Sequence, residues 1–356
     1  MLDARCSMLD ARFSVLGSRF SDPASPSFFG PCFVLFSLFP GLLAAFSAAL
    51  NLFGEIRKWL EFVKFSHTIF ALPFALASML IAARDTRGWP GAKTFFLILV
   101  AMVCARTCAM AFNRIVDRRF DKENPRTSIR HLPAGKISVA SAWTLWSVSA
   151  AGLVAVSGLL NPLCLYLSPV ALFVVCFYSL TKRFTDFTHI YLGIAIALAP
   201  IGAWIAVRGD FSLIPEGGAF NDGCLVPLLL AVAVVFWLIG FDVIYAIQDY
   251  EFDRKHGLHS IVVRWGPQNA LRAAFLSHTI MLLLLGVFGL LCGFRVAYFV
   301  GLGLIMVAVL FEHFIARIRK MNWVQNAFFR LNAVISIVFL AVTLAEIMFP
   351  GFRVNR

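Results

Sequence analysis

Nine apolar segments, each close to twenty residues long, limit the possible folds of this chain more than any other feature. They cover residues 62–83, 94–113, 138–158, 161–180, 189–207, 225–247, 270–291, 296–316 and 327–348. A helix needs about 20 predominantly apolar residues to cross the hydrocarbon core of a bilayer. Backbone polar groups in lipid must be hydrogen-bonded within the segment itself, so these lengths indicate helices. The sequence therefore predicts an all-α polytopic membrane protein with a bundle of nine transmembrane helices.

The composition supports lipid as the solvent for most of the chain. Of its 356 residues, 60% are hydrophobic and only 14% are charged, which is more apolar surface than one compact core can bury. The net charge of +12 does not indicate a nucleic-acid partner. The Lys and Arg residues stand in short runs between apolar segments, as in the loops of membrane proteins. We expect contact with the lipid bilayer and none with nucleic acid.

The distribution of basic residues predicts an orientation. The loops after even-numbered helices are rich in Lys and Arg, among them Arg118, Arg119, Lys136, Arg254, Lys255, Arg317 and Lys320. The opposite loops hold fewer, namely Arg84, Arg87, Lys93, Arg208 and Arg295. Because basic loops stay on the cytoplasmic side, we expect a protein of the bacterial-type inner (plasma) membrane. Its even-numbered helices would end in the cytoplasm.

The N-terminal residues differ from the rest of the chain. The opening "MLDARCSMLDAR" repeats a pentapeptide, and the apolar stretch from Phe33 to Leu52 is interrupted by Pro40 and Gly41. Residues 1–52 could form an extra helix, a signal-like segment or an extension from a mis-assigned start. We therefore predict three parts: an extension (1–52), a membrane domain (53–349) and a short tail (350–356).

Two polar clusters follow the second and sixth apolar segments. "NRIVDRRFD" holds Asn113, Asp117 and Asp121, and "YAIQDYEFD" holds a tyrosine and two aspartates at the same spacing, Tyr245, Asp249 and Asp253. On a helix, steps of four residues place three side chains along one stripe. Both stripes are therefore expected at the cytoplasmic ends of their helices, and the correspondence suggests an internal duplication.

The chemistry of the clusters indicates a metal-assisted anion site. Carboxylates that converge with nothing between them repel one another, and Mg²⁺ relieves this by binding carboxylate oxygens together with substrate phosphates. The neighbouring Arg and Lys residues are suitable partners for the same anion. A single such cluster is typical of an ordinary helix end, but two copies at corresponding positions favour a functional site. The pair predicts a diphosphate-binding site at the mouth of an apolar bundle.

These motifs resemble those of the UbiA superfamily of intramembrane aromatic prenyltransferases. The similar passages are "NRIVDRRFD", the following "NPRTSIRHLPAGKIS" and the later "YAIQDYEFD", and the resemblance covers about residues 55–349. The passages "KFSHTIFALPFALAS" and "YSLTKRFTDFTH" are most similar to the 4-hydroxybenzoate polyprenyltransferase branch and its menaquinone-pathway relatives. The first 50 residues resemble nothing in this family.

The resemblance implies a nine-helix fold, a polyprenyl diphosphate donor, an aromatic hydroxy acid acceptor and Mg²⁺. It assigns the metal–diphosphate to Asn113, Asp117, Asp121, Asp249 and Asp253. It makes the expected charge partners of the phosphates Arg114, Arg126, Lys182 and Arg183. The implied reaction is transfer of the prenyl group to a ring carbon ortho to a phenol hydroxyl, in quinone biosynthesis.

Four further residues are candidates with plausible structural alternatives. Lys64 and His67 would bind the acceptor carboxylate or the phosphates, although a snorkelling lysine and a hydrogen-bonded histidine are ordinary at a helix start. Asp242 would orient the acceptor hydroxyl or take its proton, and Tyr245 would contact substrate. A buried, hydrogen-bonded structural role is the alternative for Asp242.

Other functions fit the sequence less well. A dihydroxynaphthoate is the alternative acceptor, and haem, chlorophyll and homogentisate prenylation match the first and fourth to fifth helices less closely. A transporter would place its ionisable groups near the bilayer midplane, whereas these clusters lie at one membrane face. A membrane phosphatidyltransferase would need the pattern D-G-x-x-A-R, which the chain lacks.

Overall fold

The computed structural model describes residues 53–213, 223–318 and 321–349, without the side chains of residues 67, 69, 318 and 321–328. The chain divides into two units, Met1–Lys58 and Trp59–Arg356. Within the first unit, the described residues 53–58 are helical. The predicted extension (1–52) and tail (350–356) lie outside the described residues. All that follows concerns the second unit.

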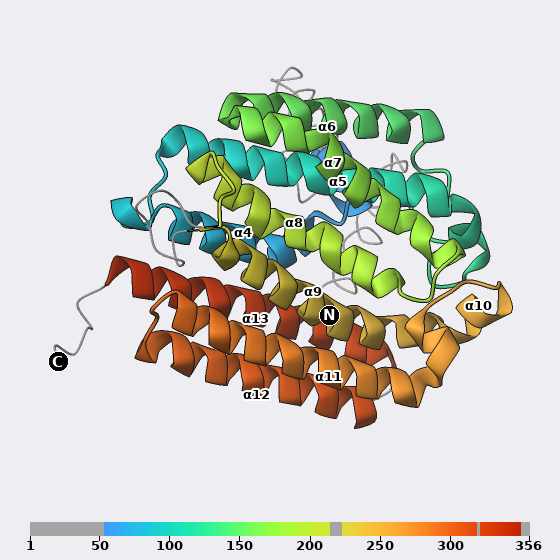
Figure 1. Cartoon of the computed structure of the whole chain (residues 1–356). Coiled ribbons are helices and arrows are strands. Elements are labelled where there is room, and N and C mark those ends of the chain that lie inside the picture. The colour runs from blue at the N-terminus through green and yellow to red at the C-terminus, as the bar shows by residue number, and fades with distance from the viewer. Residues whose placement is uncertain (1–52, 214–222, 319–320, 350–356) are drawn as a thin grey trace, which may run out of the picture. The chain divides into compact units, whose positions relative to one another are not determined.

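Helices of this unit form a bundle (Figure 1). The long helices are α4 (Thr68–Ala82), α5 (Ala92–Glu123), α6 (Val139–Leu160), α7 (Pro162–Phe177), α8 (Thr188–Arg208), α9 (Leu225–Ala246), α11 (Ile261–Leu291), α12 (Val296–Ile318) and α13 (Met321–Met348). The short elements are η1 (Phe65–His67), η2 (Arg84–Thr86), η3 (Tyr178–Arg183), η5 (Ile247–Asp249) and α10 (Tyr250–Lys255). The described residues contain no strand.

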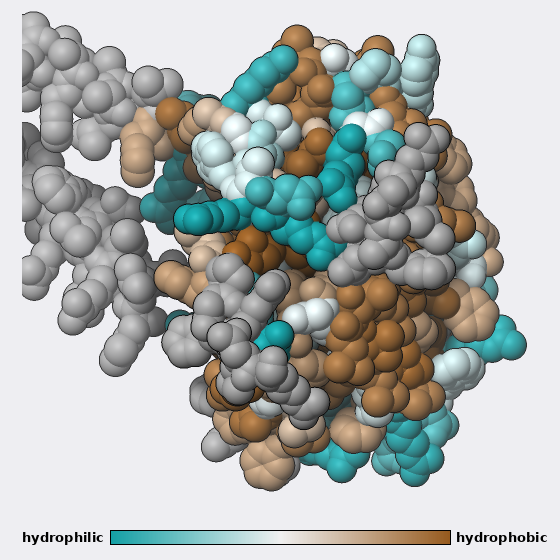
Figure 2. All heavy atoms as spheres, turned by 60° about the vertical axis from the view of Figure 1, so that its left-hand side comes forward, coloured by the Kyte–Doolittle hydropathy of each residue, from teal (hydrophilic) through white to brown (hydrophobic). Residues whose placement is uncertain are grey.

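The prediction of an all-α polytopic membrane protein is confirmed. Within the described residues, eight helices are long and apolar enough to cross a membrane, and Phe70–Ala82 of α4 is a shorter apolar helix. Hydrophobic residues (brown in Figure 2) cover large continuous areas of the described surface, as lipid contact requires. Each predicted apolar segment corresponds to one of these nine helices.

Among the helix limits that differ from the prediction are those of α4, α5 and α11. The first predicted segment begins at residue 62, but α4 begins at Thr68, because Lys64 adopts a left-handed conformation (φ 49°, ψ 52°) that cannot continue a right-handed helix. Helix α5 continues to Glu123 instead of ending at 113, so the whole first motif is helical. Helix α11 begins at Ile261 and bends at Gly266 (φ 77°), directly before Pro267.

The core of the bundle lies around α9. This helix packs against α8 and α11, and α4 packs against α8 and α13. Trp237 of α9 is fully buried, and its ring contacts the rings of Phe70 and Phe74 of α4. Hydrogen bonds also join the helices inside the core: Trp237 Nε1 donates to Asn332 Oδ1 (2.8 Å) and Asn332 Nδ2 donates to Glu312 Oε1 (2.8 Å). These bonds fix the relative positions of α9, α12 and α13.

Gly240 sets the separation of α9 and α11. A Cβ atom at this position would lie 2.3 Å from the ring of His278, which is far closer than real Cβ atoms approach. The His278 ring cannot easily move, because its Nδ1 is 2.9 Å from His313 Nε2 and its Nε2 is 3.1 Å from the carbonyl oxygen of Trp237. The missing side chain therefore permits this helix contact.

We predict that Gly240→Ala lowers the thermal midpoint of the detergent-solubilised protein. Overpacking at a rigid contact costs about 1–3 kcal/mol, which exceeds the gain of about 1 kcal/mol in helix propensity. The matched control is Gly202→Ala in α8, where a Cβ atom would meet nothing within 4 Å. The control should melt at the wild-type temperature or slightly above it. A Gly240→Ala protein that melts no lower than its control would contradict this account of the contact.

Candidate active site

A cavity of about 730 Å³ runs between α4, α5, α6, α7, α8 and α9. Its lining changes from polar to apolar along the helices. Toward the C-terminal ends of α5 and α9 the lining includes the polar residues Asn113, Asp117, Asp121, Asn124, Arg126, Arg130, Lys182, Arg183, Asp249 and Asp253. Toward the other ends it includes Ile98, Met102, Leu153, Leu160, Ile205 and Phe211. Such a space can hold a molecule with an anionic head and an apolar tail.

The first motif lies on the last turns of α5. Asn113 Nδ2 donates to Asp117 Oδ2 (2.9 Å), one helical turn away. The buried Asp121 accepts from Arg130 Nη1 (2.5 Å), and its other oxygen lies 4.0 Å from Arg114 Nη1. The predicted stripe of three side chains on one helix therefore exists, and all three line the cavity.

The second motif has a different backbone. Helix α9 ends at Ala246, a 3₁₀ turn covers Ile247–Asp249, and α10 begins at Tyr250. The expectation of a single helical stripe is therefore wrong here, because the chain tightens into the 3₁₀ geometry common at helix ends. Tyr245, Asp249 and Asp253 nevertheless all line the same cavity as the first motif.

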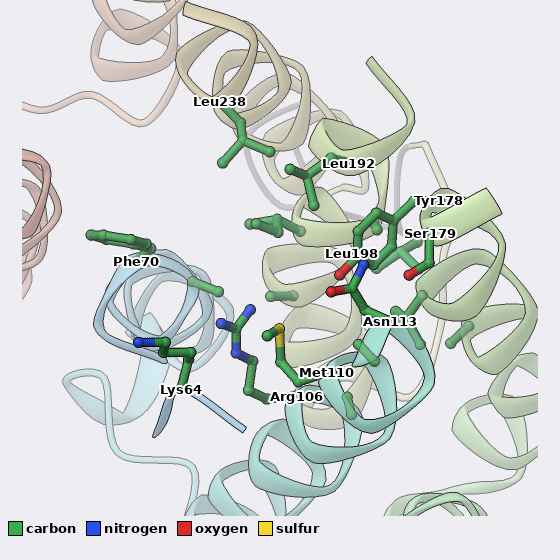
Figure 3. A pocket seen from close by; sticks show the side chains of 18 of the residues that line it. Lys64, Phe70, Arg106, Met110, Asn113, Tyr178, Ser179, Leu192, Leu198 and Leu238 are labelled. Atoms are coloured by element: carbon green, nitrogen blue, oxygen red, sulfur yellow. The ribbon is translucent and has the colours of Figure 1, made fainter. Parts of the chain in front are cut away.

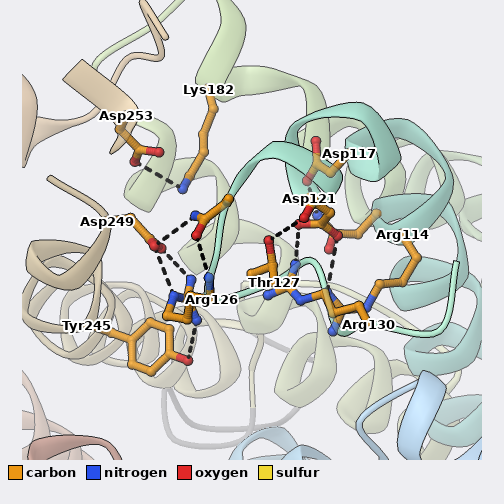
Figure 4. Close-up of polar contacts among 12 residues, drawn as sticks. Arg114, Asp117, Asp121, Arg126, Thr127, Arg130, Lys182, Tyr245, Asp249 and Asp253 are labelled. Carbon is orange, nitrogen blue, oxygen red and sulfur yellow. Dashed lines mark hydrogen bonds and ion pairs between the residues drawn. The ribbon is translucent and has the colours of Figure 1, made fainter. Parts of the chain in front are cut away.

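The segment after α5 connects the two motifs (Figure 4). Arg126 donates through Nε to Asp249 Oδ1 (2.9 Å) and makes a second, shorter bond to Asp249 Oδ2. Its Nη1 also lies 3.3 Å from the Tyr245 hydroxyl. Asn124 Nδ2 donates to Asp249 Oδ1 at 3.2 Å. The loop that follows the first motif thus supplies the partners of the second.

The turn η3 contacts both motifs. Lys182 Nζ lies 3.6 Å from Asp253 Oδ2, and Arg183 Nη2 lies 3.4 Å from Asp117 Oδ1. Arg183 Nη2 also donates to the carbonyl oxygen of Val116 (2.8 Å). Each of the four motif aspartates therefore faces at least one cationic side chain. All four predicted charge partners lie at the cavity, with Arg114 beside Asp121.

The cations at the cavity affect one another's protonation. Burial lowers the pKa of Lys64, and the nearby charges of Arg114 and Arg130 lower it further. Burial alone would lower the pKa of Arg126, but the hydrogen bond and charge of Asp249 outweigh it and hold that pKa above its usual value. Arg126 therefore remains cationic, whereas Lys64 gives up its proton more easily than an isolated lysine.

The motif residues suit Mg²⁺ only together with an anionic ligand. Among the described residues, no three His, Cys, Asp or Glu side chains lie close enough to hold a metal ion by themselves. Asp121 Oδ2 and Asp253 Oδ2, one from each motif, are buried and lack a hydrogen-bond partner. Mg²⁺ is commonly bound by one or two carboxylates and completed by substrate phosphates and water. The donor set therefore fits a metal that arrives with a diphosphate.

The remaining predicted residues are placed as follows. Lys64 lines the cavity, and so does Asp242, about one turn deeper than Tyr245. Asp242 accepts a hydrogen bond from His189, which sequence analysis did not identify. The side chain of His67 lies outside the described residues, so its predicted role stays a prediction.

Arg106 is a second residue that sequence analysis missed. It lies on α5 two turns before Asn113, and its guanidinium group reaches into the cavity (Figure 3). Its Nε is buried and has no hydrogen-bond partner, as is also true of Ser179 Oγ on the cavity wall. The sequence feature that could have identified Arg106 is the presence of an ionisable residue inside an apolar membrane segment. The position of Arg106 in the middle of "VCARTCAM" concealed it beside the denser motif that follows.

Comparisons with known proteins agree with this architecture. The chain is 29% identical over 298 residues to a 4-hydroxybenzoate octaprenyltransferase of Coxiella burnetii, covering 83% of this chain and 98% of that protein. It is 29% identical over 260 residues to the same enzyme of Methylobacillus flagellatus, covering 73% and 83% of the two chains.

Solved structures with a similar fold include the apo UbiA homolog from Aeropyrum pernix K1. It is 32% identical in sequence, with a TM-score of 0.69, and the match covers 79% of this chain and 98% of that one. A UbiA homolog from Archaeoglobus fulgidus bound to GPP and Mg²⁺ shares the fold at 23% identity and a TM-score of 0.62, covering 82% and 99%. Residues 71–334 match the UbiA prenyltransferase family. The chain is therefore a membrane prenyltransferase that belongs to the UbiA prenyltransferase family.

Proposed function

We propose that this protein transfers a polyprenyl group from polyprenyl diphosphate to a ring carbon of an aromatic hydroxy acid, 4-hydroxybenzoate, in quinone biosynthesis. The cavity carries this proposal, because its polar mouth holds both aspartate motifs and the rest of its lining is mostly apolar. The relatives named 4-hydroxybenzoate octaprenyltransferase support the choice of acceptor. The basic loops favour a bacterial inner membrane with this mouth toward the cytoplasm.

The diphosphate of the donor binds at the polar mouth. Lys182, Arg183 and Arg126 line it and supply fixed positive charge to the phosphate oxygens. Asp121 and Asp253 would hold Mg²⁺ through the carboxylate oxygens that lack a hydrogen-bond partner, and Asn113, Asp117 and Asp249 would complete the set predicted for the metal–diphosphate. Bound Mg²⁺ supplies Lewis-acid stabilisation of the charge that develops on the leaving diphosphate.

The apolar part of the cavity serves the prenyl group. The bond between the donor's C1 and the diphosphate oxygen breaks, and its electron pair leaves with the diphosphate. The resulting allylic cation would react with water, which an apolar lining excludes. The faces of Phe70, Phe241 and Tyr245 at the cavity can stabilise positive charge. The isoprenoid tail extends along the apolar residues of α5, α7 and α8.

The acceptor lies between the donor's C1 and the deeper polar groups. Arg106 and Lys64 bind its carboxylate, since Arg106 offers an unpartnered Nε inside an otherwise apolar region. Asp242 faces the hydroxyl end and accepts the proton that is lost after the ring carbon attacks. A dihydroxynaphthoate carries the same two groups on a larger ring system, so the same residues serve the alternative acceptor.

Metal dependence is the first expected outcome. Membranes containing the protein should transfer a labelled prenyl group to 4-hydroxybenzoate, lose this activity on chelation and regain it with added Mg²⁺. The reason is that Asp121 and Asp253 each present, at the mouth, a carboxylate oxygen without a hydrogen-bond partner. A parallel assay with a dihydroxynaphthoate distinguishes the two acceptors. Full activity in excess chelator would remove the proposed metal role of both motifs.

We expect Asp117→Asn to abolish most of the turnover without unfolding the protein. The amide keeps the size of the side chain and can still accept from Asn113, but it lacks the charge that the metal–diphosphate requires. The expected loss is on the order of 10²-fold, which corresponds to about 3 kcal/mol of transition-state stabilisation. Asp249→Asn should behave similarly, with some loss of stability because Arg126 loses an ionised partner.

Asp85→Asn is the matched control for these two variants. Asp85 pairs with Arg208 at the other end of the bundle and is largely exposed, so its replacement should change neither turnover nor melting temperature. Turnover at saturating Mg²⁺ and detergent melting curves are measured for all three. Near-normal turnover of both motif variants would assign the motifs a structural role at helix ends.

Arg106→Met tests the acceptor site. Loss of a charged hydrogen bond costs about 1.5–3 kcal/mol, so the KM for 4-hydroxybenzoate should rise about 10- to 100-fold. The KM for the prenyl diphosphate should remain near the wild-type value, and Arg106→Lys should recover part of the acceptor affinity. An equal change in both KM values would show that Arg106 does not discriminate between the substrates.

A further inference from the structure

A histidine that is not part of the cavity lining contacts the carboxylate of Asp242. His189, in the first turn of α8, places its Nδ1 2.6 Å from Asp242 Oδ2. Its side chain is fully buried and is not part of the cavity lining. Asp242, by contrast, lines the cavity and keeps 24% of its side chain exposed. The histidine can therefore act on a bound ligand only through the aspartate.

The bond between the two residues defines what the histidine can do. A distance of 2.6 Å is typical of a charge-assisted hydrogen bond, in which Nδ1–H donates to an ionised carboxylate. This bond uses Oδ2, and it is the only side-chain hydrogen bond of Asp242 within the described part of the chain. The other oxygen, Oδ1, is left for a ligand. The imidazole thus fixes the rotation of the carboxylate.

A purely structural histidine would be expected to satisfy both ring nitrogens. His278 of this chain does so, with one nitrogen 2.9 Å from His313 and the other 3.1 Å from the carbonyl oxygen of Trp237. Nε2 of His189 is equally buried but has no hydrogen-bond partner. Within the described residues, the hydrogen bond to Asp242 is therefore the polar contact that explains why a histidine stands at this position.

We propose that His189 is a positioning residue that fixes the Asp242 carboxylate through a hydrogen bond to Oδ2 and so directs Oδ1 toward the acceptor ring. This inference rests on the proposed function. In the step concerned, the C1–O electron pair has left with diphosphate, and π electrons of the ring form the new C–C bond to C1 of the allylic cation. The ring C–H electrons then restore aromaticity, and the proton is transferred to Oδ1 of Asp242. His189 keeps its Nδ1 proton and its hydrogen bond throughout.

Two substitutions of His189 separate hydrogen bonding from packing. His189→Leu fills similar space without a donor, whereas His189→Gln retains an N–H that can reach the carboxylate. General-base catalysis contributes about 10²- to 10⁴-fold, so Asp242→Asn should lower kcat about 10²-fold or more. His189→Leu should lower kcat about 10-fold or more, and His189→Gln should recover most of the loss. The KM for the prenyl diphosphate should change in none of them.

Two further measurements test whether His189 acts in the transfer of the ring proton to Asp242. Slow release of diphosphate from the donor in the absence of acceptor should be unchanged in His189→Leu but lost in Asp117→Asn, since only the latter alters the polar mouth. The double variant with Asp242→Asn and His189→Leu should be no slower than Asp242→Asn alone, because the two residues act as a unit. Melting temperatures are recorded for every variant.

Several results would overturn the inference. A normal kcat in His189→Leu would do so. Equal losses of kcat in His189→Leu and His189→Gln, in proportion to their lowered melting temperatures, would also do so. So would additive losses of kcat in the double variant. Wild-type protein that releases diphosphate but prenylates neither aromatic acid would overturn the proposed function together with this inference. Wild-type prenylation with a fully active His189→Leu variant would overturn this inference alone.

Discussion

The architecture of the site depends on the pairing of carboxylates with cations across the two halves of the bundle. An unpaired charge in apolar surroundings is strongly unfavourable, and removing one partner of a buried pair is more costly than never having had the pair. Here Arg126, from the loop after α5, pairs with Asp249 after α9, and Lys182 from η3 pairs with Asp253. The charged side chains that would bind substrate therefore also hold the two halves of the bundle in their relative positions.

This pairing explains how an anionic substrate and a cation can enter together. A diphosphate alone would compete with the aspartates for their cations, and a metal ion alone would compete with the cations for the aspartates. A metal–diphosphate complex offers a new partner to both sets at once, so no group is left uncompensated. The proposed requirement for Mg²⁺ follows from this balance as much as from the carboxylate oxygens of Asp121 and Asp253 that lack a hydrogen-bond partner.

Most of the fold could be predicted from the sequence, because lipid imposes a length and a composition on every spanning helix. The exceptions arise where local backbone geometry departs from a simple helix, as at Lys64 and at the 3₁₀ turn of Ile247–Asp249. The aspartates were found because their spacing repeats along the chain. His189, Arg106 and Asn124 were not, since their partners or cavity positions depend on helix packing that no local pattern encodes.

The length of the cavity has a consequence for product release. Lining residues occur along α8 from Thr188 to Ala206, which at 1.5 Å per residue is nearly 30 Å, about the thickness of the hydrocarbon layer. An isoprenoid bound there is already aligned with the surrounding acyl chains. Under the proposed function, the prenylated product would pass into lipid with its tail unhydrated, while the diphosphate would leave through the polar mouth into water. The two products would then partition into different phases, and this separation would oppose the reverse reaction.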